Sequence, residues 1–357
     1  MLSNPFKFLD SYQKEDAKRF FGRNKEIAQL FNAVQSSNLI MVYGGSGTGK
    51  TSLINCGLAN KFTASDWLPI EVRRKADINT SLAREIRSQF SNPADFDESQ
   101  PVRHAIRSLY MDHFRPIYLI FDQFEELYIM GPKSEQRKFH DTVSDLLQAG
   151  IQCKILLIIR EEYLAYLADF EKAVPSLFDN RLRIEKMNRQ NLSRVIAGTC
   201  RYGGITLDQP RKTVSDILEN LRQKREGIDL TNLQVYLDRL WRKDLERQGR
   251  SESDTITFDP ALVERVGKME NVLSDFLDEQ MQEVEQGLKR RGHKKPEGIP
   301  LEILFTMVTE DGTKRQAEKH TILEGLPKNR NITAEDVEFC MAEFNRIKLL
   351  RSFKEEE

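Results

Sequence analysis

A glycine-rich loop followed by lysine and threonine constrains the fold of this chain more than any other feature. Eight consecutive residues match the pattern G-x-x-x-x-G-K-[ST]: Gly44, Gly45, Ser46, Gly47, Thr48, Gly49, Lys50 and Thr51. The apolar residues 39–43 predict a buried strand before the loop, and residues 52–59 predict a helix after it. This order presents backbone N–H groups and a helix N-terminus to phosphate, and it disfavours the alternative of a simple glycine-rich turn.

The side chains of this phosphate loop have separate expected roles. Lys50 is expected to reach the β- and γ-phosphates of a nucleotide, and the Thr51 hydroxyl is expected to ligate Mg²⁺. We count Ser52, at the start of the helix, among the nucleotide-binding residues. The sequence contains no Asn/Thr-Lys-x-Asp motif for guanine, so ATP and ADP are the expected nucleotides.

Acidic residues follow a second apolar strand, predicted at 117–121. Asp122 stands at its carboxyl end, where α/β sheets place their ligands, and is predicted to hold Mg²⁺ rather than to cap a helix. Glu125 or Glu126 is placed to accept a proton from an attacking water. The alternative is two solvated glutamates on the next helix, and the pattern does not choose between the two residues.

An arginine ends the next predicted strand, at residues 155–160. The guanidinium of Arg160 is placed to sense the γ-phosphate or to stabilise charge in the transition state. The alternative is a surface arginine paired with Glu161 or Glu162. A strand end beside the predicted pocket favours the sensor role.

The order of the predicted elements indicates several domains in a chain of 357 residues. Strand–helix alternation with continuous apolar strands predicts a P-loop NTPase core with a parallel sheet and helices on both faces. Helices alone follow, and the last ones lead into a predicted strand at 348–353, an order that resembles a winged helix. We therefore expect an N-terminal lead at 1–17, the NTPase domain at 18–177, a helical domain at 178–265 and a winged-helix-like domain at 266–357.

Composition narrows the classes of partner. The net charge of −1 provides no general attraction for nucleic acid. The one dense basic cluster, 289–295, is interpreted as a solvated loop between two helices, and contact with nucleic acid is the alternative that is not favoured. Four cysteines without C-x-x-C spacing argue against a zinc site or disulfides and suit a reducing cytoplasm. Residues 1–7 lack the apolar core of a signal peptide, and no apolar run approaches the ~20 residues of a membrane helix.

Together these motifs resemble the STAND class of P-loop NTPases, and most closely its bacterial branch commonly fused to WD-repeat or other sensor arrays, with a NACHT/NB-ARC-like module. The resemblance covers residues 4 to about 353. Phe21, Gly22 and Arg23 are similar to the motif on the adenine side of the family's site, although Asn24 replaces the usual glutamate. Further matching segments are 4–9, 16–23, 122–127, 158–164, 230–241, 311–315 and 349–351.

This chain departs from the family's pattern at two further places. Thr231 stands where the family usually has a proline near the adenine. Family members usually continue past residue 351 into a wing with a histidine that contacts ADP, and then into a sensor. We therefore expect that this chain is part of a longer protein, or that its sensor lies on another subunit, and that no effector domain precedes Phe20.

The resemblance implies an ATP/ADP-dependent signalling switch. It is expected to bind Mg²⁺ and ATP, to hydrolyse ATP slowly and to form homo-oligomers on activation by an unknown trigger, with an unknown effector and a role in bacterial antiviral defence. One alternative is an AAA+ ATPase that loads or remodels DNA, for which Arg222, Arg225 and Arg239 are candidate ATP-facing residues. Another is a scaffold that binds nucleotide without turnover, and a small-molecule kinase is disfavoured.

Overall fold

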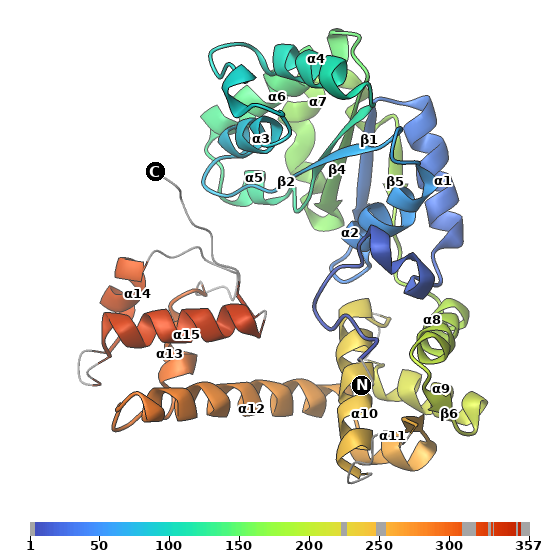
Figure 1. Cartoon of the computed structure of the whole chain (residues 1–357), viewed down its shortest axis with the longest axis vertical. Coiled ribbons are helices and arrows are strands. Elements are labelled where there is room, and N and C mark those ends of the chain that lie inside the picture. The colour runs from blue at the N-terminus through green and yellow to red at the C-terminus, as the bar shows by residue number, and fades with distance from the viewer. Residues whose placement is uncertain are drawn as a thin grey trace. The chain divides into compact units, whose positions relative to one another are not determined.

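The computed structural model describes residues 4–222, 227–247, 255–308, 319–327, 330, 332–347 and 349–350, without the side chains of residues 271 and 273–276. The chain divides into two compact units, Met1–Val266 and Gly267–Glu357. Figure 1 shows the sheet and the helices that cover it in the first unit.

A five-stranded parallel sheet forms the centre of the first unit, which confirms the predicted P-loop NTPase core. Its strand order is β2-β3-β4-β1-β5. The strands are β1 (Leu39–Gly44), β2 (Leu68–Val72), β3 (Ile117–Phe121), β4 (Cys153–Arg160) and β5 (Arg181–Arg183). Strand β5, which is short and has an arginine at each end, was not predicted.

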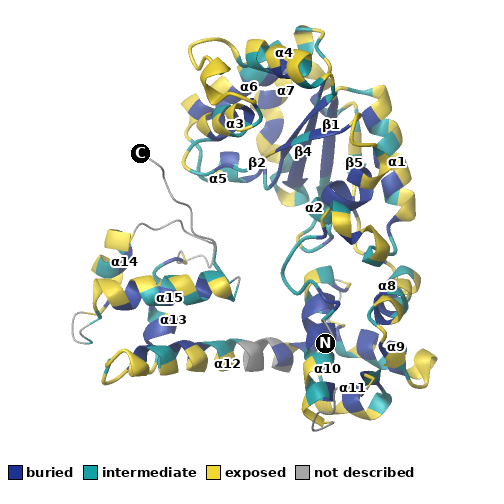
Figure 2. Ribbon diagram, viewed as in Figure 1, coloured by how far each residue is buried: buried dark blue, intermediate teal, exposed yellow. Residues whose placement is uncertain are grey.

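The central strands are apolar at successive positions because helices cover both faces of the sheet. Every residue of β3 is buried. On one face, Met41, Leu119 and Leu157 belong to a core that also includes side chains of α3, α4, α6 and α7. On the other face, Ile40, Val42 and others pack with α1 and with the helix that follows the loop. Figure 2 shows the buried sheet between more exposed helices.

Helices connect the strands of this core. Residues 53–58, after α2, form a wider π-helical turn rather than a regular helix. The helices are α1 (Asn24–Ser36), α2 (Lys50–Ser52), α3 (Ile78–Arg87), α4 (Val102–His113), α5 (Glu126–Ile129), α6 (Lys133–Gln148) and α7 (Ala168–Ala173).

The first unit ends in a helical region. Its helices are α8 (Arg189–Tyr202), α9 (Pro210–Asn220), α10 (Leu230–Arg247) and α11 (Pro260–Val266). Two strands of two residues each, β6 (Thr206–Leu207) and β7 (Thr257–Phe258), pair in parallel beside them. These strands are too short to show a periodic pattern, and they were not predicted.

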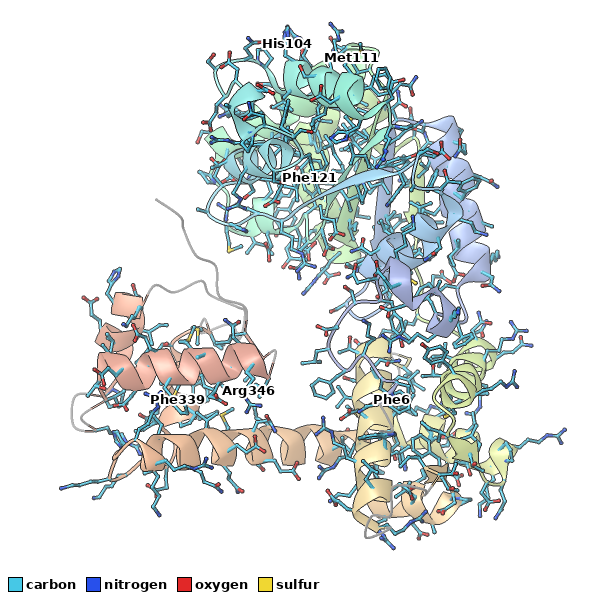
Figure 3. The ribbon with its side chains drawn as sticks, in the orientation of Figure 1. Phe6, His104, Met111, Phe121, Phe339 and Arg346 are labelled. Atoms are coloured by element: carbon cyan, nitrogen blue, oxygen red, sulfur yellow. The ribbon has the colours of Figure 1, made fainter. Side chains whose placement is uncertain are left out.

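The N-terminal lead contains a short helix. Lys14–Arg19 form a 3₁₀ helix, in which Asp16 is buried and forms ion pairs with Lys7 and Arg19. Before it, the lead packs on the helical region: Asn4 Nδ2 donates to Asp238 Oδ1 of α10 at 2.5 Å. The rings of Phe6, labelled in Figure 3, and Phe258 stack with their centroids 6.2 Å apart.

In the second unit, all regular elements of the described residues are helices. They are α12 (Met269–Arg290), α13 (Ile299–Phe305), α14 (Lys319–Gly325) and α15 (Ala334–Arg346). Side chains such as Val284, Ile303 and Phe344 form their core. The expected winged-helix landmark at 311–315 and all of the predicted strand 348–353 except residues 349–350 lie outside the described residues. The winged helix therefore stays a prediction.

The basic cluster 289–295 begins in the last turn of α12. Lys289 and Arg290 stand near the negative end of the helix dipole. The guanidinium of Arg291 lies 4.6 Å from the centroid of the Phe339 ring on α15. Part of this cluster therefore contributes to packing within the second unit.

We expect Leu119→Ala to lower the free energy of unfolding of the first unit by about 2–5 kcal/mol, because Leu119 is fully buried in the central sheet. Urea unfolding followed by the fluorescence of Trp67, a buried residue of the same unit, measures the change. Met111→Ala is the control, because 57% of Met111 is exposed on α4 (Figure 3). Equal losses in the two variants would contradict the described core.

Candidate nucleotide-binding site

The phosphate loop lies at the carboxyl edge of the parallel sheet. Gly44 ends β1 and is in register with Arg160 at the end of β4. An added Cβ at Gly44 would lie 2.3 Å from the carbonyl oxygen of Ile184, so a side chain has no room there. Gly49 precedes α2 and adopts the left-handed conformation. The loop thus turns from the strand directly to a helix N-terminus, which favours anions.

Lys50 is held by the loop itself. Its ammonium donates to the carbonyl oxygens of Gly44 and Gly45, both at 2.8 Å. Burial lowers the pKa of Lys50 below its ordinary value, and the nearby Glu125 carboxylate opposes this effect. A cationic side chain is therefore already positioned over the loop where phosphate oxygens are expected.

Thr51 and Asp122 are brought together by the fold, although 71 positions separate them. The Thr51 hydroxyl donates to Asp122 Oδ1 at 2.9 Å, and Asp122 is 3% exposed. A hydroxyl beside a carboxylate oxygen fits Mg²⁺, which binds few protein oxygens and keeps phosphate and water ligands. In the described ranges, no group of three His, Cys, Asp or Glu side chains is arranged to hold a metal ion.

Glu125 and Arg160 form an ion pair at the same edge. Arg160 Nε lies 3.1 Å from Glu125 Oε1, and the Arg160 backbone N–H donates to Glu125 Oε2 at 3.3 Å. Glu125 is buried, which raises the pKa of its carboxyl above the ordinary value. Glu126 is only partly buried and begins α5. The predicted alternative partner of Arg160, Glu161, instead pairs with Arg183.

The Phe21-Gly22-Arg23 segment contacts the backbone of the phosphate loop through Arg23. Arg23 is 3% exposed, and its Nη2 donates to the carbonyl oxygens of Thr48 and Glu185, both at 2.8 Å. The Phe21 ring lies so close to Gly198 of α8 that an added Cβ at Gly198 would be 2.8 Å from it. Arg23 therefore ties the loop to the chain after β5, and the predicted adenine contact of this segment stays a prediction.

Ser52 is connected to the N-terminal lead. Its hydroxyl oxygen accepts the backbone N–H of Tyr12 at 3.0 Å. The lead thus contacts both α10 and the helix that begins in the phosphate loop.

The start of α10 lies on the loop, and sequence reasoning missed this contact. The Leu230 N–H donates to the Gly47 carbonyl at 3.0 Å. An added Cβ at Gly47 would lie 1.9 Å from both carboxylate oxygens of Asp229. Asp229 also accepts the Thr231 N–H at 2.8 Å, as a helix-capping residue does. An acid directly before a predicted helix was the available signal, but the sequence does not show that the helix meets the loop.

Arg73 is the second functional candidate that sequence reasoning missed. It follows β2 and forms an ion pair with Asp122. The available signal was a strand followed by a charged residue, as at Asp122 and Arg160. This signal indicates a contact with Asp122 only once β2 and β3 are known to be neighbours in the sheet, and the tertiary structure decides which strands are neighbours.

Two of the three arginines proposed for a DNA-remodelling ATPase lie in the described part of the chain. Arg222 pairs with Glu219, and 70% of its side chain is exposed. Arg239 is partly buried on α10, and Arg225 lies outside the described residues.

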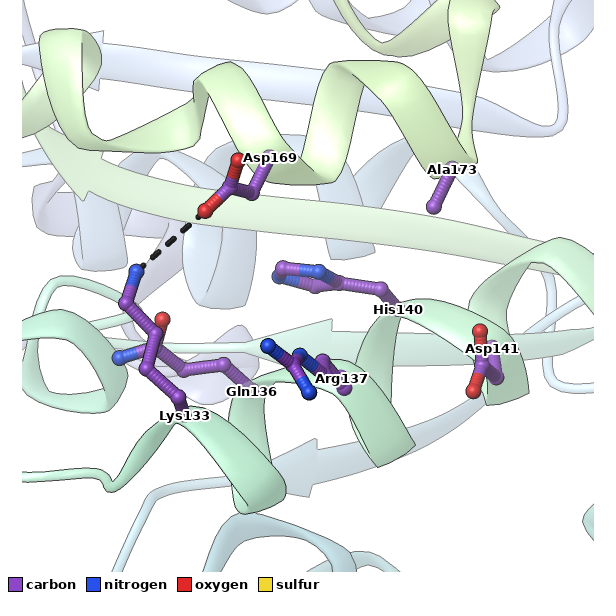
Figure 4. Close-up of a pocket in the computed structure, with 7 residues that line it drawn as sticks. All are labelled: Lys133, Gln136, Arg137, His140, Asp141, Asp169 and Ala173. Atoms are coloured by element: carbon purple, nitrogen blue, oxygen red, sulfur yellow. Dashed lines mark hydrogen bonds and ion pairs between the residues drawn. The ribbon is translucent and has the colours of Figure 1, made fainter.

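A separate cavity of about 310 Å³ lies between α6 and α7 and includes none of the loop residues (Figure 4). Lys133 and Asp169 pair within its lining at 3.4 Å. His140 is stacked on Phe170, and its Nε2 is 3.1 Å from the Tyr128 hydroxyl oxygen. Burial lowers the pKa of His140 to about 4, so this ring is neutral at pH 7. These contacts account for Lys133, Asp169 and His140 without a ligand.

Replacing Gly47 with alanine is expected to displace Asp229 from the loop, because the added carbon would overlap its carboxylate. Gly150→Ala is the matched control: both glycines have a φ near +60°, but no atom lies within 4 Å of a Cβ at Gly150. The control should lose only ~1–2 kcal/mol of unfolding free energy through backbone strain. Urea unfolding should show a larger loss for Gly47→Ala, which Asp229→Ala partly restores. Equal losses would contradict the contact.

Solved structures with a similar fold are P-loop ATPases. The Aeropyrum pernix ORC2 protein in its ADPNP–ADP complexes is 15% identical, with a TM-score of 0.54 over 95% of this chain and 99% of that chain. The Walker-type ATPase paby2304 of Pyrococcus abyssi is 16% identical, with a TM-score of 0.52 over 95% and 100%. The A. pernix ORC1 protein in complex with DNA is 16% identical, with a TM-score of 0.51 over 92% and 84%. These likenesses show the fold.

A search among curated proteins found no match to this sequence. In the described part of the chain, no helix has the length and apolar character needed to cross a membrane. The sequence matches the family model of Novel STAND NTPase 1 over residues 5–355, nearly the whole chain, which confirms the resemblance seen in the motifs. The chain therefore belongs to the Novel STAND NTPase 1 family.

Proposed function

We propose that this protein is a nucleotide-driven switch that binds Mg²⁺ with ATP or ADP and hydrolyses ATP slowly. The observation that carries the proposal is the contact of Asp229 and Leu230 with Gly47, because it joins the helical region to the phosphate loop. A nucleotide bound there changes the charge beside a contact between two parts of the first unit.

In this proposal, the loop N–H groups, the N-terminus of α2 and Lys50 bind the phosphates. Lys50 exchanges its bonds to the Gly44 and Gly45 carbonyls for phosphate oxygens. Thr51 and Asp122 hold Mg²⁺, which supplies charge neutralisation at the β- and γ-phosphates. Arg23 keeps the loop in shape through the Thr48 carbonyl.

Glu125 is the proposed general base. A carboxylate with a raised pKa is a better proton acceptor than an ordinary glutamate, and Glu125 is the buried member of the pair. Its ion pair with Arg160 holds both side chains at the sheet edge. Arg160, whose side chain is 36% exposed, is then the proposed sensor of the γ-phosphate.

The switch needs a free-energy difference between the two nucleotide states. ATP carries more negative charge than ADP because it has a γ-phosphate. The Asp229 carboxylate lies against the loop that would bind these phosphates. Two unit charges 4 Å apart interact by about 4 kcal/mol at an effective dielectric constant of 20. Complete inversion of a two-state equilibrium needs about 5.5 kcal/mol. Repulsion of this size, together with other contacts, can therefore favour release of α10 in the ATP state.

The wider role follows the family. We propose that release exposes surfaces for homo-oligomerisation, that a trigger and an effector act from outside this chain, and that the setting is bacterial antiviral signalling in the cytoplasm. Membership of a STAND family supports this proposal. We also propose that residues 267–357 form the winged-helix-like part of the switch.

We expect Glu125→Gln to slow ATP hydrolysis by about 10²–10⁴-fold, the usual contribution of a general base. Glu126→Gln is the control and should change the rate little, because Glu126 is less buried. Single-turnover assays with bound ATP measure both. The same rate in all three proteins, at the uncatalysed background, would instead favour the scaffold without turnover.

The pH profile provides a second check on Glu125. A base must be deprotonated, and burial raises the pKa of this carboxyl above its ordinary value of 4.5. Hydrolysis should therefore fall on the acid side at a higher pH than an unperturbed glutamate would give. Glu125→Gln should lack this acid limb.

The switch itself predicts different assembly states in ADP and ATP. Sedimentation of the Glu125→Gln variant should show larger particles in ATP than in ADP, because hydrolysis is blocked. The Asp229→Ala variant should assemble at a lower ATP concentration than the unsubstituted protein, because it lacks a contact of the resting state. Identical sedimentation of the full-length protein in both nucleotides would contradict the switch. DNA retention in a mobility-shift assay would instead favour the DNA-remodelling alternative.

A further inference from the structure

Arg73 follows the last residue of β2, and Asp122 follows the last residue of β3. The two residues lie side by side at the same edge of the sheet. Strands β2 and β3 are parallel neighbours, with Val72 in register with Phe121. The Asp122 backbone N–H donates to the Val72 carbonyl at 3.0 Å. The next residue of each strand therefore emerges at one position, which brings a guanidinium to the carboxylate proposed for Mg²⁺.

Both oxygens of Asp122 are engaged, by different partners. Oδ1 accepts the Thr51 hydroxyl at 2.9 Å, and Oδ2 pairs with Arg73 Nη2. The two side chains of the ion pair differ in exposure: 3% for Asp122 and 28% for Arg73. The carboxylate is thus fixed inside the protein, whereas the guanidinium comes from the solvent side.

The neighbouring Arg74 shows what a structural arginine looks like at this edge. It is 6% exposed, and its Nε and Nη2 pair with the two oxygens of Glu135, both at 2.9 Å. Glu135 is buried as well and also accepts the Ile78 N–H at 2.7 Å. Glu135 therefore ties Arg74 and the start of α3 to α6, whereas Arg73 forms its ion pair with the proposed magnesium ligand.

A buried carboxylate without a counter-charge is unfavourable, and a guanidinium and Mg²⁺ repel each other at one carboxylate. We propose that Arg73 is a positioning residue that holds Asp122 in its ligating orientation in the cation-free site and yields Oδ2 when Mg²⁺ binds with nucleotide. This inference rests on the proposed nucleotide-binding function. It implies that Arg73 lowers the affinity for Mg²⁺ and supports nucleotide binding without it.

The test uses the whole chain and a fluorescent ADP analogue, so that hydrolysis plays no part. Affinity is measured in EDTA and over a series of Mg²⁺ concentrations. Arg73→Gln should weaken ADP binding in EDTA by about tenfold, because a positive charge beside the phosphates is lost. It should also lower the Mg²⁺ concentration for half-maximal enhancement by about tenfold, because the competitor is gone.

Two further variants distinguish positioning from folding. Arg73→Lys keeps the charge and should retain most of both effects, and it serves as the second variant if Arg73→Gln does not fold. Arg74→Gln removes a buried ion pair and should lower the midpoint of thermal unfolding without changing the Mg²⁺ dependence. Near-UV circular dichroism of each variant checks its tertiary structure.

The outcomes separate the inference from the function on which it rests. If the unsubstituted protein binds ADP and Arg73→Gln leaves the Mg²⁺ dependence unchanged, or weakens both affinities equally, the role assigned to Arg73 is wrong and the switch is unaffected. If the unsubstituted protein binds no nucleotide in EDTA or in Mg²⁺, the proposed function and this inference both fail.

Discussion

The parallel pairing of β1, β3 and β4 is the constraint on which the site depends. Parallel strands end at one edge, so the residues that follow them are gathered there whatever their distance in sequence. Gly44 and Arg160 are brought into register in this way, and β3 between β2 and β4 delivers Asp122. The apolar cores on both faces of the sheet stabilise this arrangement and leave the edge to polar chemistry.

Three acids at this edge have a basic partner from another segment. Asp122 pairs with Arg73, Glu125 with Arg160, and Glu161 with Arg183. Such pairing reduces the cost of keeping charges in a partly buried site before a ligand arrives. It also means that a bound nucleotide and cation must compete with existing contacts. Such competition agrees with the conditional binding and slow turnover that we propose.

The contacts behind the loop connect the site to the rest of the first unit. Arg23 joins the Thr48 carbonyl to the Glu185 carbonyl, and Leu230 joins α10 to Gly47. The N-terminal lead meets α10 at Asp238 and the loop helix at Ser52. A change at the phosphates is therefore adjacent to three segments that belong to the helical region or contact it. This arrangement gives the proposed switch a physical route within one unit.

The sequence by itself determined much of the local chemistry: the strand and phosphate loop at 39–51, the apolar strand before Asp122, Arg160 at a strand end and a run of helices after the core. These features are local, because periodicity, glycines and a conspicuous loop pattern depend on residues near one another in the chain. The short strands β5, β6 and β7 were not predicted, because two or three residues are too few to show a periodic pattern of apolar side chains. Only the tertiary structure decided that Glu125 pairs with Arg160, that Arg73 meets Asp122 and that Asp229 lies on Gly47. These contacts join residues 35, 49 and 182 positions apart, and strand order and helix packing, which no local pattern encodes, bring them together.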